Sequence, residues 1–371
     1  MKSSLEARVD HDERYYLSSQ WQLMWRKFQK HRVATVGGTV LLLLYLIAIF
    51  CEFFSVYDVS HRHGRNVHSP PVRIHLLDDQ KRVFLRPFVY GLEQTMDPVT
   101  LRRVYAEDRD RIYPVKFFVH GDPYELWGLF KTDIHFMGTD GGVLFLFGSD
   151  ALGRDLFSRV LYAMRTSLSI GLVGVLLSFV LGSLIGGVSG FYGGAVDTLI
   201  QRIIEFLICI PVIPLWMGLA AALPTDWPAT KTYFAITIIL AIIGWTRLAR
   251  VVRGKLLSLR ETDFVMAAKL CGVRQRAIIL RHLLPSFMSY LIVSLTLSIP
   301  QMILGETALS FLGLGLQPPA VSLGVLLQEA QNLTTVAHHP WLLIPGLVVI
   351  AVVLCFNFLG DGLRDAADPY R

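Results

Sequence analysis

The sequence predicts an all-α integral membrane protein with about six transmembrane helices and a small extracytoplasmic α+β insertion after the first of them. The first observation is composition: 53% of the 371 residues are hydrophobic and only 17% are charged, whereas soluble domains carry about 25% charged residues. The second is a series of apolar runs that approach the length of a membrane span. The third is a long polar stretch of mixed charge that separates the first run from the others.

The predicted spans are apolar runs of roughly 20 residues, the length that crosses the hydrocarbon core. They cover residues 33–54, 167–187, 199–223, 234–248, 287–304 and 342–359. The run at 234–248 is the shortest, so five spans is the alternative to six. The first run is expected to be retained as a span, because the polar segment before it is longer than a signal n-region and no small-residue cleavage site follows.

Basic flanks predict the orientation, because short cytoplasmic segments of membrane proteins are rich in Lys and Arg. Such residues crowd the end of segment 1–32 and the segment 246–286. Both are therefore expected in the cytoplasm, together with the tail 362–371. Residues 55–147 are then expected outside the cell membrane, where 113–122 has the alternation of a strand.

The sequence does not indicate nucleic-acid binding, a metal site or an enzyme active site. The net charge of +6 raises nucleic-acid binding as a question, but the basic residues adjoin the predicted spans, where topology explains them. The four cysteines form no paired metal motif. The sequence also contains neither a G-x-x-x-x-G-K-[ST] phosphate loop nor an H-E-x-x-H zinc motif. We therefore expect no enzyme activity, no cofactor, no metal and no nucleic-acid partner.

The most informative polar segment is 261–286, ETDFVMAAKLCGVRQRAIILRHLLPS. Residues 263–270 favour a helix, and Gly272 is placed to end it in the left-handed conformation that glycine adopts most easily. A second amphipathic stretch, 274–284, runs to Pro285, which ends it. Two short helices joined at a glycine predict a compact cytoplasmic knob. A simple interfacial helix is the alternative.

This segment resembles the EAA loop of binding-protein-dependent ABC importer permeases. The matching positions are Ala267, Ala268, Gly272, Leu284 and Pro285. Met266 stands where the family has glutamate, and His282 stands where isoleucine is frequent, although histidine there is common in the peptide branch. The resemblance implies that these residues, with Arg274, contact an ATPase subunit.

Three further segments resemble the dipeptide and oligopeptide branch of the same family. They are GSDALGRDLFSRVLYAMRTSLSIG at 148–171, ETALSFLGLGLQPPAVSLGVLLQEA at 306–330, and NFLGDGLRDAADPYR at 357–371. The resemblance therefore implies a permease core over 148–361, and it does not cover most of the insertion at 55–147.

Two features within the predicted spans can be interpreted without the resemblance: a glycine repeat and a charged residue. Gly182, Gly186, Gly190 and Gly194 recur every fourth residue, which predicts a helix face that a neighbouring backbone can approach closely. Glu306 lies near the outer end of the fifth predicted span, where a charge is costly. A structural role and a place on a translocation path are both open for this residue.

Taken together, the resemblance implies the C-type permease subunit of a type I ABC importer for peptides, in the inner membrane of a bacterium. It implies a second, homologous permease as partner in a heterodimer, two ABC ATPase subunits and a periplasmic solute-binding protein, with membrane lipid around the spans. The same machinery carrying an oligosaccharide, an opine or nickel is an alternative. A secondary transporter is another, which would show inverted repeats with broken helices.

Overall fold

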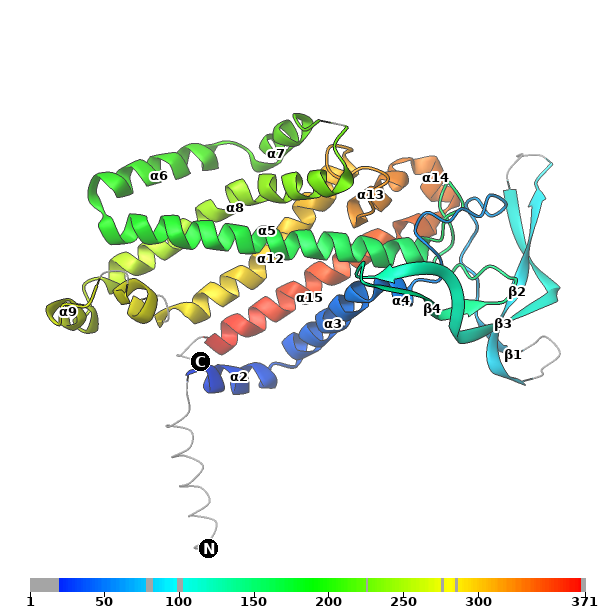
Figure 1. Ribbon diagram of the computed structural model, residues 1–371, viewed down its shortest axis with the longest axis horizontal. Coiled ribbons are helices and arrows are strands. Elements are labelled where there is room, and N and C mark those ends of the chain that lie inside the picture. The colour runs from blue at the N-terminus through cyan, green and yellow to red at the C-terminus, as the bar shows by residue number, and fades with distance from the viewer. Residues whose placement is uncertain are drawn as a thin grey trace, which may run out of the picture.

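The computed structural model describes residues 20–77, 83–98, 103–224, 226–274, 277–283 and 286–367. The molecule is elongated, with a bundle of long helices in the middle, a β-sheet at one end and the short helix α9 at the other (Figure 1). Both described ends of the chain lie on the α9 side of the bundle.

The helices account for most of the described chain. The α-helices are α2 (Gln20–Lys30), α3 (Arg32–Ile49), α4 (Cys51–Phe54), α5 (Leu156–Tyr192), α6 (Gly194–Cys209), α7 (Val212–Ala221), α8 (Ala229–Leu259), α9 (Asp263–Leu270), α12 (Met288–Phe311), α13 (Leu323–Gln328), α14 (Leu333–His338) and α15 (Ile344–Ala367). Shorter turns are the π-helix η1 (Ile278–Leu283) and the 3₁₀ helices η2 (Glu329–Gln331) and η3 (Pro340–Leu343).

Within the described residues, five helical segments are long and apolar enough to cross a membrane, and a sixth span exists if the bent pair α6–α7 is one span. The prediction of about six spans, with five as the alternative, is thus confirmed. The sixth span depends on α6–α7 and not on the short run 234–248, which lies within the 31-residue α8. The predicted span 199–223 is not one straight helix, because α6 and α7 meet at an angle of 86°. Pro211 explains the break, since proline has no amide hydrogen and its ring disfavours a helical conformation in the residue before it.

The helix α5 is much longer than the predicted span 167–187. It has 37 residues, which is about 55 Å at the α-helical rise and well beyond the roughly 30 Å of a hydrocarbon core. Most of its extra residues, 156–166, lie at the sheet end and include the charged Arg159 and Arg165. A charged, hydrogen-bonded start therefore continues into an apolar span without a break.

The insertion is an antiparallel sheet in the order β1-β2-β3-β4, formed by β1 (His75–Leu77), β2 (Val83–Met96), β3 (Arg103–Leu126) and β4 (Phe130–Thr139). Among the described residues of 55–147, the regular elements are strands, so the helical part of the expected α+β insertion is not found there. The helix α4 packs against β3 and β4 instead, and Phe157 of α5 packs on the core of the insertion. Helices α4 and α5 thus pack against the sheet, in place of a helix within the insertion.

The glycine repeat brings α5 close to the backbone of α8. A Cβ atom added to Gly182 or Gly190 would lie 2.9 Å from a backbone carbonyl oxygen of α8, and one on Gly186 would meet the carbonyl oxygen of Ala249 still more closely. The structure corrects the prediction for Gly194, the expected fourth glycine on this helix face. It lies after α5 has ended, has a positive φ of +57°, and would meet nothing within 4 Å.

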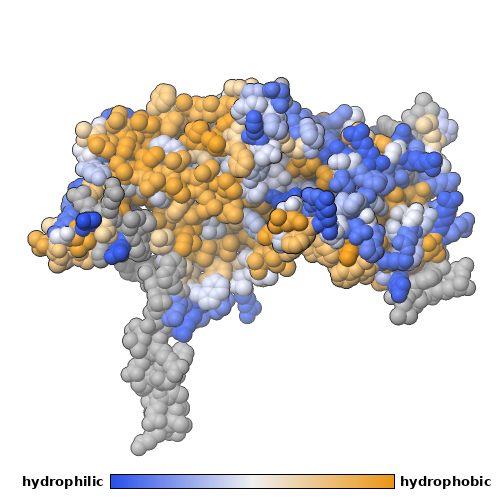
Figure 2. Space-filling view, in the orientation of Figure 1, coloured by the Kyte–Doolittle hydropathy of each residue, from blue (hydrophilic) through white to orange (hydrophobic). Residues whose placement is uncertain are grey.

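The surface divides along the long axis. Figure 2 shows hydrophobic residues covering the helical bundle and mostly hydrophilic residues covering the sheet end. The exposed apolar side chains include many on α3, α5, α6 and α15. This distribution is typical of a bundle surrounded by lipid with a polar domain in water.

Candidate coupling loop and outer polar network

The segment 261–286 forms a compact knob at the end of the bundle opposite the sheet. Val265 of α9 and Ile278 and Leu283 of η1 are fully buried. They pack in one apolar cluster with Val252 and Leu256 of α8 and with Phe287 and Leu291, which begin α12. The knob is therefore joined by side-chain packing to the two spans that flank it.

Gly272 ends α9 as the sequence predicts. Its φ is +72°, its amide donates to the carbonyl of Lys269 at 3.0 Å, and the amide of Val273 donates to the carbonyl of Ala268 at 3.1 Å. This pair of hydrogen bonds is a Schellman motif, which needs a left-handed residue at this position. The second amphipathic stretch contains a π-helix, η1, and Leu284 and Pro285 lie outside the described residues.

The outer face of the knob is apolar and basic. Phe264, Met266 and Leu270 are exposed, and Leu270 is 87% exposed. Ala267 and Arg274 are also exposed, whereas Ala268 is half-buried. The methionine that replaces the family's glutamate thus adds to an uncovered apolar surface. The knob therefore has an inner face buried against α8 and α12 and an outer face with exposed apolar side chains.

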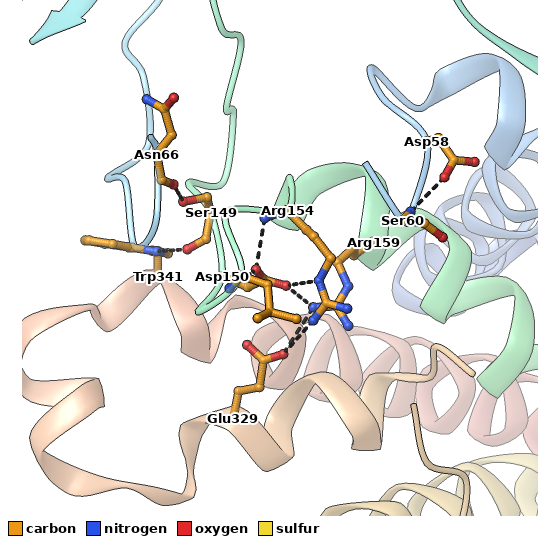
Figure 3. A network of polar contacts seen from close by, with 10 residues as sticks. Asp58, Ser60, Asn66, Ser149, Asp150, Arg154, Arg159, Glu329 and Trp341 are labelled. Carbon is orange, nitrogen blue, oxygen red and sulfur yellow. Dashed lines mark hydrogen bonds and ion pairs between the residues drawn. The ribbon is translucent and has the colours of Figure 1, made fainter. Parts of the chain in front are cut away.

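A network of charges lies at the opposite end of the bundle (Figure 3). Asp150 accepts hydrogen bonds from the side chains of Arg154, at 2.6 Å, and of Arg159. Both arginines also reach Glu329 of η2, at 3.3 Å and 3.1 Å. Arg159 and Asp150 are buried. The segment GSDALGRD therefore joins the start of α5 to η2, directly after α13.

Asp155 caps α5 in the same region. Its carboxylate accepts hydrogen bonds from the amide and the hydroxyl of Ser158, at 2.8 Å and 2.6 Å. The Ser158 hydroxyl in turn accepts from the amide of Val56, at 2.9 Å, in the chain that leads into the insertion. Burial raises the pKa of Asp155 to about 6, although the hydrogen bonds from Ser158 lower it.

Glu306 is fully buried in α12. Its carboxylate accepts hydrogen bonds of 2.8 Å from Ser167 of α5 and from Ser310 one turn later. Ser167 also accepts from the amide of Leu323, at the start of α13. The structure places Glu306 in a polar contact among three helices, with its side chain shielded from solvent.

Sequence reasoning did not find several polar partners. Arg253 of α8 holds Asp197 of α6 by two hydrogen bonds of 2.5 Å, and Arg165 of α5 pairs with Glu52 of α4. A charged residue near the end of a predicted span indicates that an oppositely charged partner is needed. Which residue is that partner depends on how the helices pack. A further pair, Arg202 and Glu205, lies one turn apart on α6, at 2.8 Å, and both side chains are exposed. The described residues contain no cluster of three or more His, Cys, Asp or Glu that could hold a metal.

The structure is thus a helical bundle with apolar, span-length helices and a short knob that packs on two of them. Residues 179–370 match the family described as binding-protein-dependent transport system inner membrane component, and residues 19–71 match the N-terminal transmembrane domain of oligopeptide transport permease C. The chain belongs to the first of these families. It is a permease subunit of an ABC transporter in the inner membrane, of the OppC and DppC type, and it is not the ATPase.

The chain is also similar to individual proteins. The chain is 43% identical to the oligopeptide transport system permease protein OppC of Haemophilus influenzae over 60% of this chain and 70% of that protein. It is 40% identical to the dipeptide transport system permease protein DppC of Bacillus subtilis over 60% and 68%, and 29% identical to OppC of the same organism over 95% and 90%. A solved structure of the MetNI methionine ABC transporter, inward facing, is 18% identical, with a TM-score of 0.42, over 56% of this chain and 95% of that chain.

Proposed function

We propose that this chain is the C-type permease of a type I importer that carries dipeptides or oligopeptides. Together with a second, homologous permease it would form the translocation path. A solute-binding protein would deliver peptides on the sheet side, and two ABC ATPases would bind on the knob side. The names of the relatives support the peptide cargo.

We further propose that the knob is on the cytoplasmic side, with both chain ends, and that the sheet is periplasmic. The basic residues of α2, α8 and the knob support this orientation. Segments 1–32 and 362–371 are then cytoplasmic, 33–54 holds the first span, 55–147 is the insertion, and 148–361 is the permease core.

The observation that carries the coupling role is the two-sided packing of the knob. Its inner face shares one apolar cluster with α8 and α12, and its outer face leaves Phe264, Met266 and Leu270 exposed. An ATPase that binds this face in one nucleotide state more tightly than in the other would shift the permease between two conformations. Motion of the knob would tilt the two attached spans and open the path.

The decisive experiment measures capture of the ATPases by the reconstituted permease pair. Leu270→Asp puts a charge on the outer face of the knob, and we expect it to weaken ATPase capture by about tenfold, or about 1.4 kcal/mol. Leu333→Asp is the matched control, because Leu333 is 84% exposed but lies in α14, near the sheet. Equal ATPase capture by the two variants would contradict the docking role. ATP-dependent uptake of a labelled tripeptide by proteoliposomes containing the binding protein tests the cargo.

A further inference from the structure

The β3–β4 hairpin turns back from the sheet toward the outer end of α3. The indole nitrogen of Trp127, in the hairpin turn, donates a hydrogen bond of 2.9 Å to the carbonyl of Ile49. The Trp127 ring lies 5.3 Å from the ring of Phe50. Ile49 is the last residue of α3, where carbonyl groups have no partner within the helix. The hairpin turn is thus attached to the end of a membrane span. Figure 1 shows β4 of this hairpin beside α4, the short helix that directly follows α3.

This turn carries an exposed apolar surface, which we call the hairpin tip and define as Trp127, Leu129 and Phe130. Leu129 is 75% exposed, Phe130 is 62% exposed and Trp127 is 50% exposed. Phe118 of β3, also exposed, extends the surface toward Phe53 of α4, with the two rings 6.0 Å apart. Contiguous large apolar side chains are unfavourable in water and mark a surface that binds something.

The strands of the hairpin carry charged side chains. Glu125 of β3 and Lys131 of β4 are opposite each other in the register, with 3.5 Å between their charged groups. Farther from the turn, His120 and Asp133 form a hydrogen bond of 2.9 Å. The charged groups therefore lie along the strands, while the tip itself carries none.

The height of the tip relative to the membrane follows from α3. This helix has 18 residues, or about 27 Å of length, which is close to the roughly 30 Å of the hydrocarbon core. Exposed apolar side chains run along it from Val33 to Ile49. Ile49 then lies at the boundary of the hydrocarbon, and a group bonded to its carbonyl lies in the interface, where Trp residues are enriched.

We propose that the hairpin tip inserts into the interfacial region of the lipid leaflet beside α3 and anchors the sheet to the membrane. The lipid-facing surface of α3 is continuous with the tip, and this continuity identifies lipid as the occupant. Residues 72–178, which include the hairpin, lie between the two family matches. The assignment needs only that α3 spans the membrane, so it is independent of the transported solute and of the knob's partner.

The experiment places a spin label on the hairpin in the assembled transporter, in nanodiscs of phosphatidylethanolamine and phosphatidylglycerol. The labelled variants are Leu129→Cys and, as matched control, His120→Cys, in a chain whose four cysteines are replaced. The His120 side chain is 76% exposed and lies on the same hairpin. Collision with oxygen, which concentrates in lipid, is compared with collision with a water-soluble nickel chelate. We expect the oxygen-to-nickel ratio to be higher at 129 than at 120 by about fivefold or more.

Two results would overturn the proposal. Equal ratios at 129 and 120 would place the tip in water. Low collision with both probes at 129 would mean that a protein subunit covers the tip. If the cysteine variants do not assemble, the unsubstituted transporter is cross-linked with a diazirine phospholipid and digested. Lipid adducts on the peptide that contains residues 127–130 are expected, and their absence, with adducts present on α3, contradicts the anchor.

Discussion

The guanidinium of Arg159 lies 3.1 Å from the carboxylate of Glu329, a residue 170 positions later in the chain. Asp150 contacts the same guanidinium from the loop before α5. The contact therefore joins the start of the longest helix to η2, the turn that follows α13. Because both Arg159 and Asp150 are buried, the network contributes to stability only while its charges remain matched.

Replacement of Arg159 by Met is expected to destabilise the chain by about 3 kcal/mol, since Asp150 would keep only one arginine partner in a buried site. Thermal unfolding of the purified chain in detergent measures the change. Arg202→Met is the control, because the Arg202–Glu205 pair is exposed and such pairs contribute about 0.5 kcal/mol. A similar loss in both variants would show that the buried network has no special role.

The contact between α5 and α8 gives a second prediction. Gly186→Ala is expected to lower stability by about 1–3 kcal/mol, because the added methyl group overlaps the backbone of Ala249 and forces the helices apart. Gly187→Ala, one residue along the same helix, meets nothing within 4 Å. It should be neutral or slightly stabilising, since alanine favours helix more than glycine does. Equal unfolding temperatures for the two variants would argue against the close contact.

Asp155 predicts a pH dependence of stability. Its pKa in the folded chain is about 6, against an ordinary value of 3.8, so the folded state favours the protonated form. Its stabilising contribution is therefore complete below about pH 4 and is lost as the pH rises through 6, by about 3 kcal/mol. Unfolding temperatures measured from pH 4 to 8 test this.

Asp155→Asn supplies the control for the pH experiment. Asparagine can still accept the hydrogen bond from the amide of Ser158 and caps helices about as well as aspartate, but it does not titrate. We expect this variant to lose the part of the slope between pH 4 and 6 that Asp155 causes. An unchanged slope would assign the pH dependence to other groups.

Gly272→Val is expected to uncouple ATP hydrolysis from uptake while the chain still inserts into the membrane. The φ of +72° strains any residue with a β-carbon, by roughly 1–2 kcal/mol, and would distort the turn between α9 and η1. We expect tripeptide uptake per ATP to fall by roughly tenfold, within the range of coupling free energies. Gly272→Asn should retain most uptake, because asparagine tolerates this conformation. Normal uptake by the valine variant would contradict the coupling role of the knob.

Much of the fold could be predicted from local features of the sequence. Apolar runs of sufficient length predict spans wherever lipid is the solvent, because unsatisfied backbone groups are too costly there for other structures. The left-handed turn at Gly272 could be predicted for the same kind of reason, since it depends on the residue and on its immediate neighbours. The break at Pro211 had a local signal as well, although the length of the apolar run concealed it.

The sequence by itself determined the membrane class, the approximate spans and the glycine turn of the knob, because each depends on residues close together in the chain. Only the tertiary structure decided that Arg159 meets Glu329, that Arg253 holds Asp197, and that Trp127 bonds to the end of α3. It also decided that serines surround Glu306. These contacts join distant segments, and their geometry depends on how the helices and the sheet pack, which no local pattern encodes.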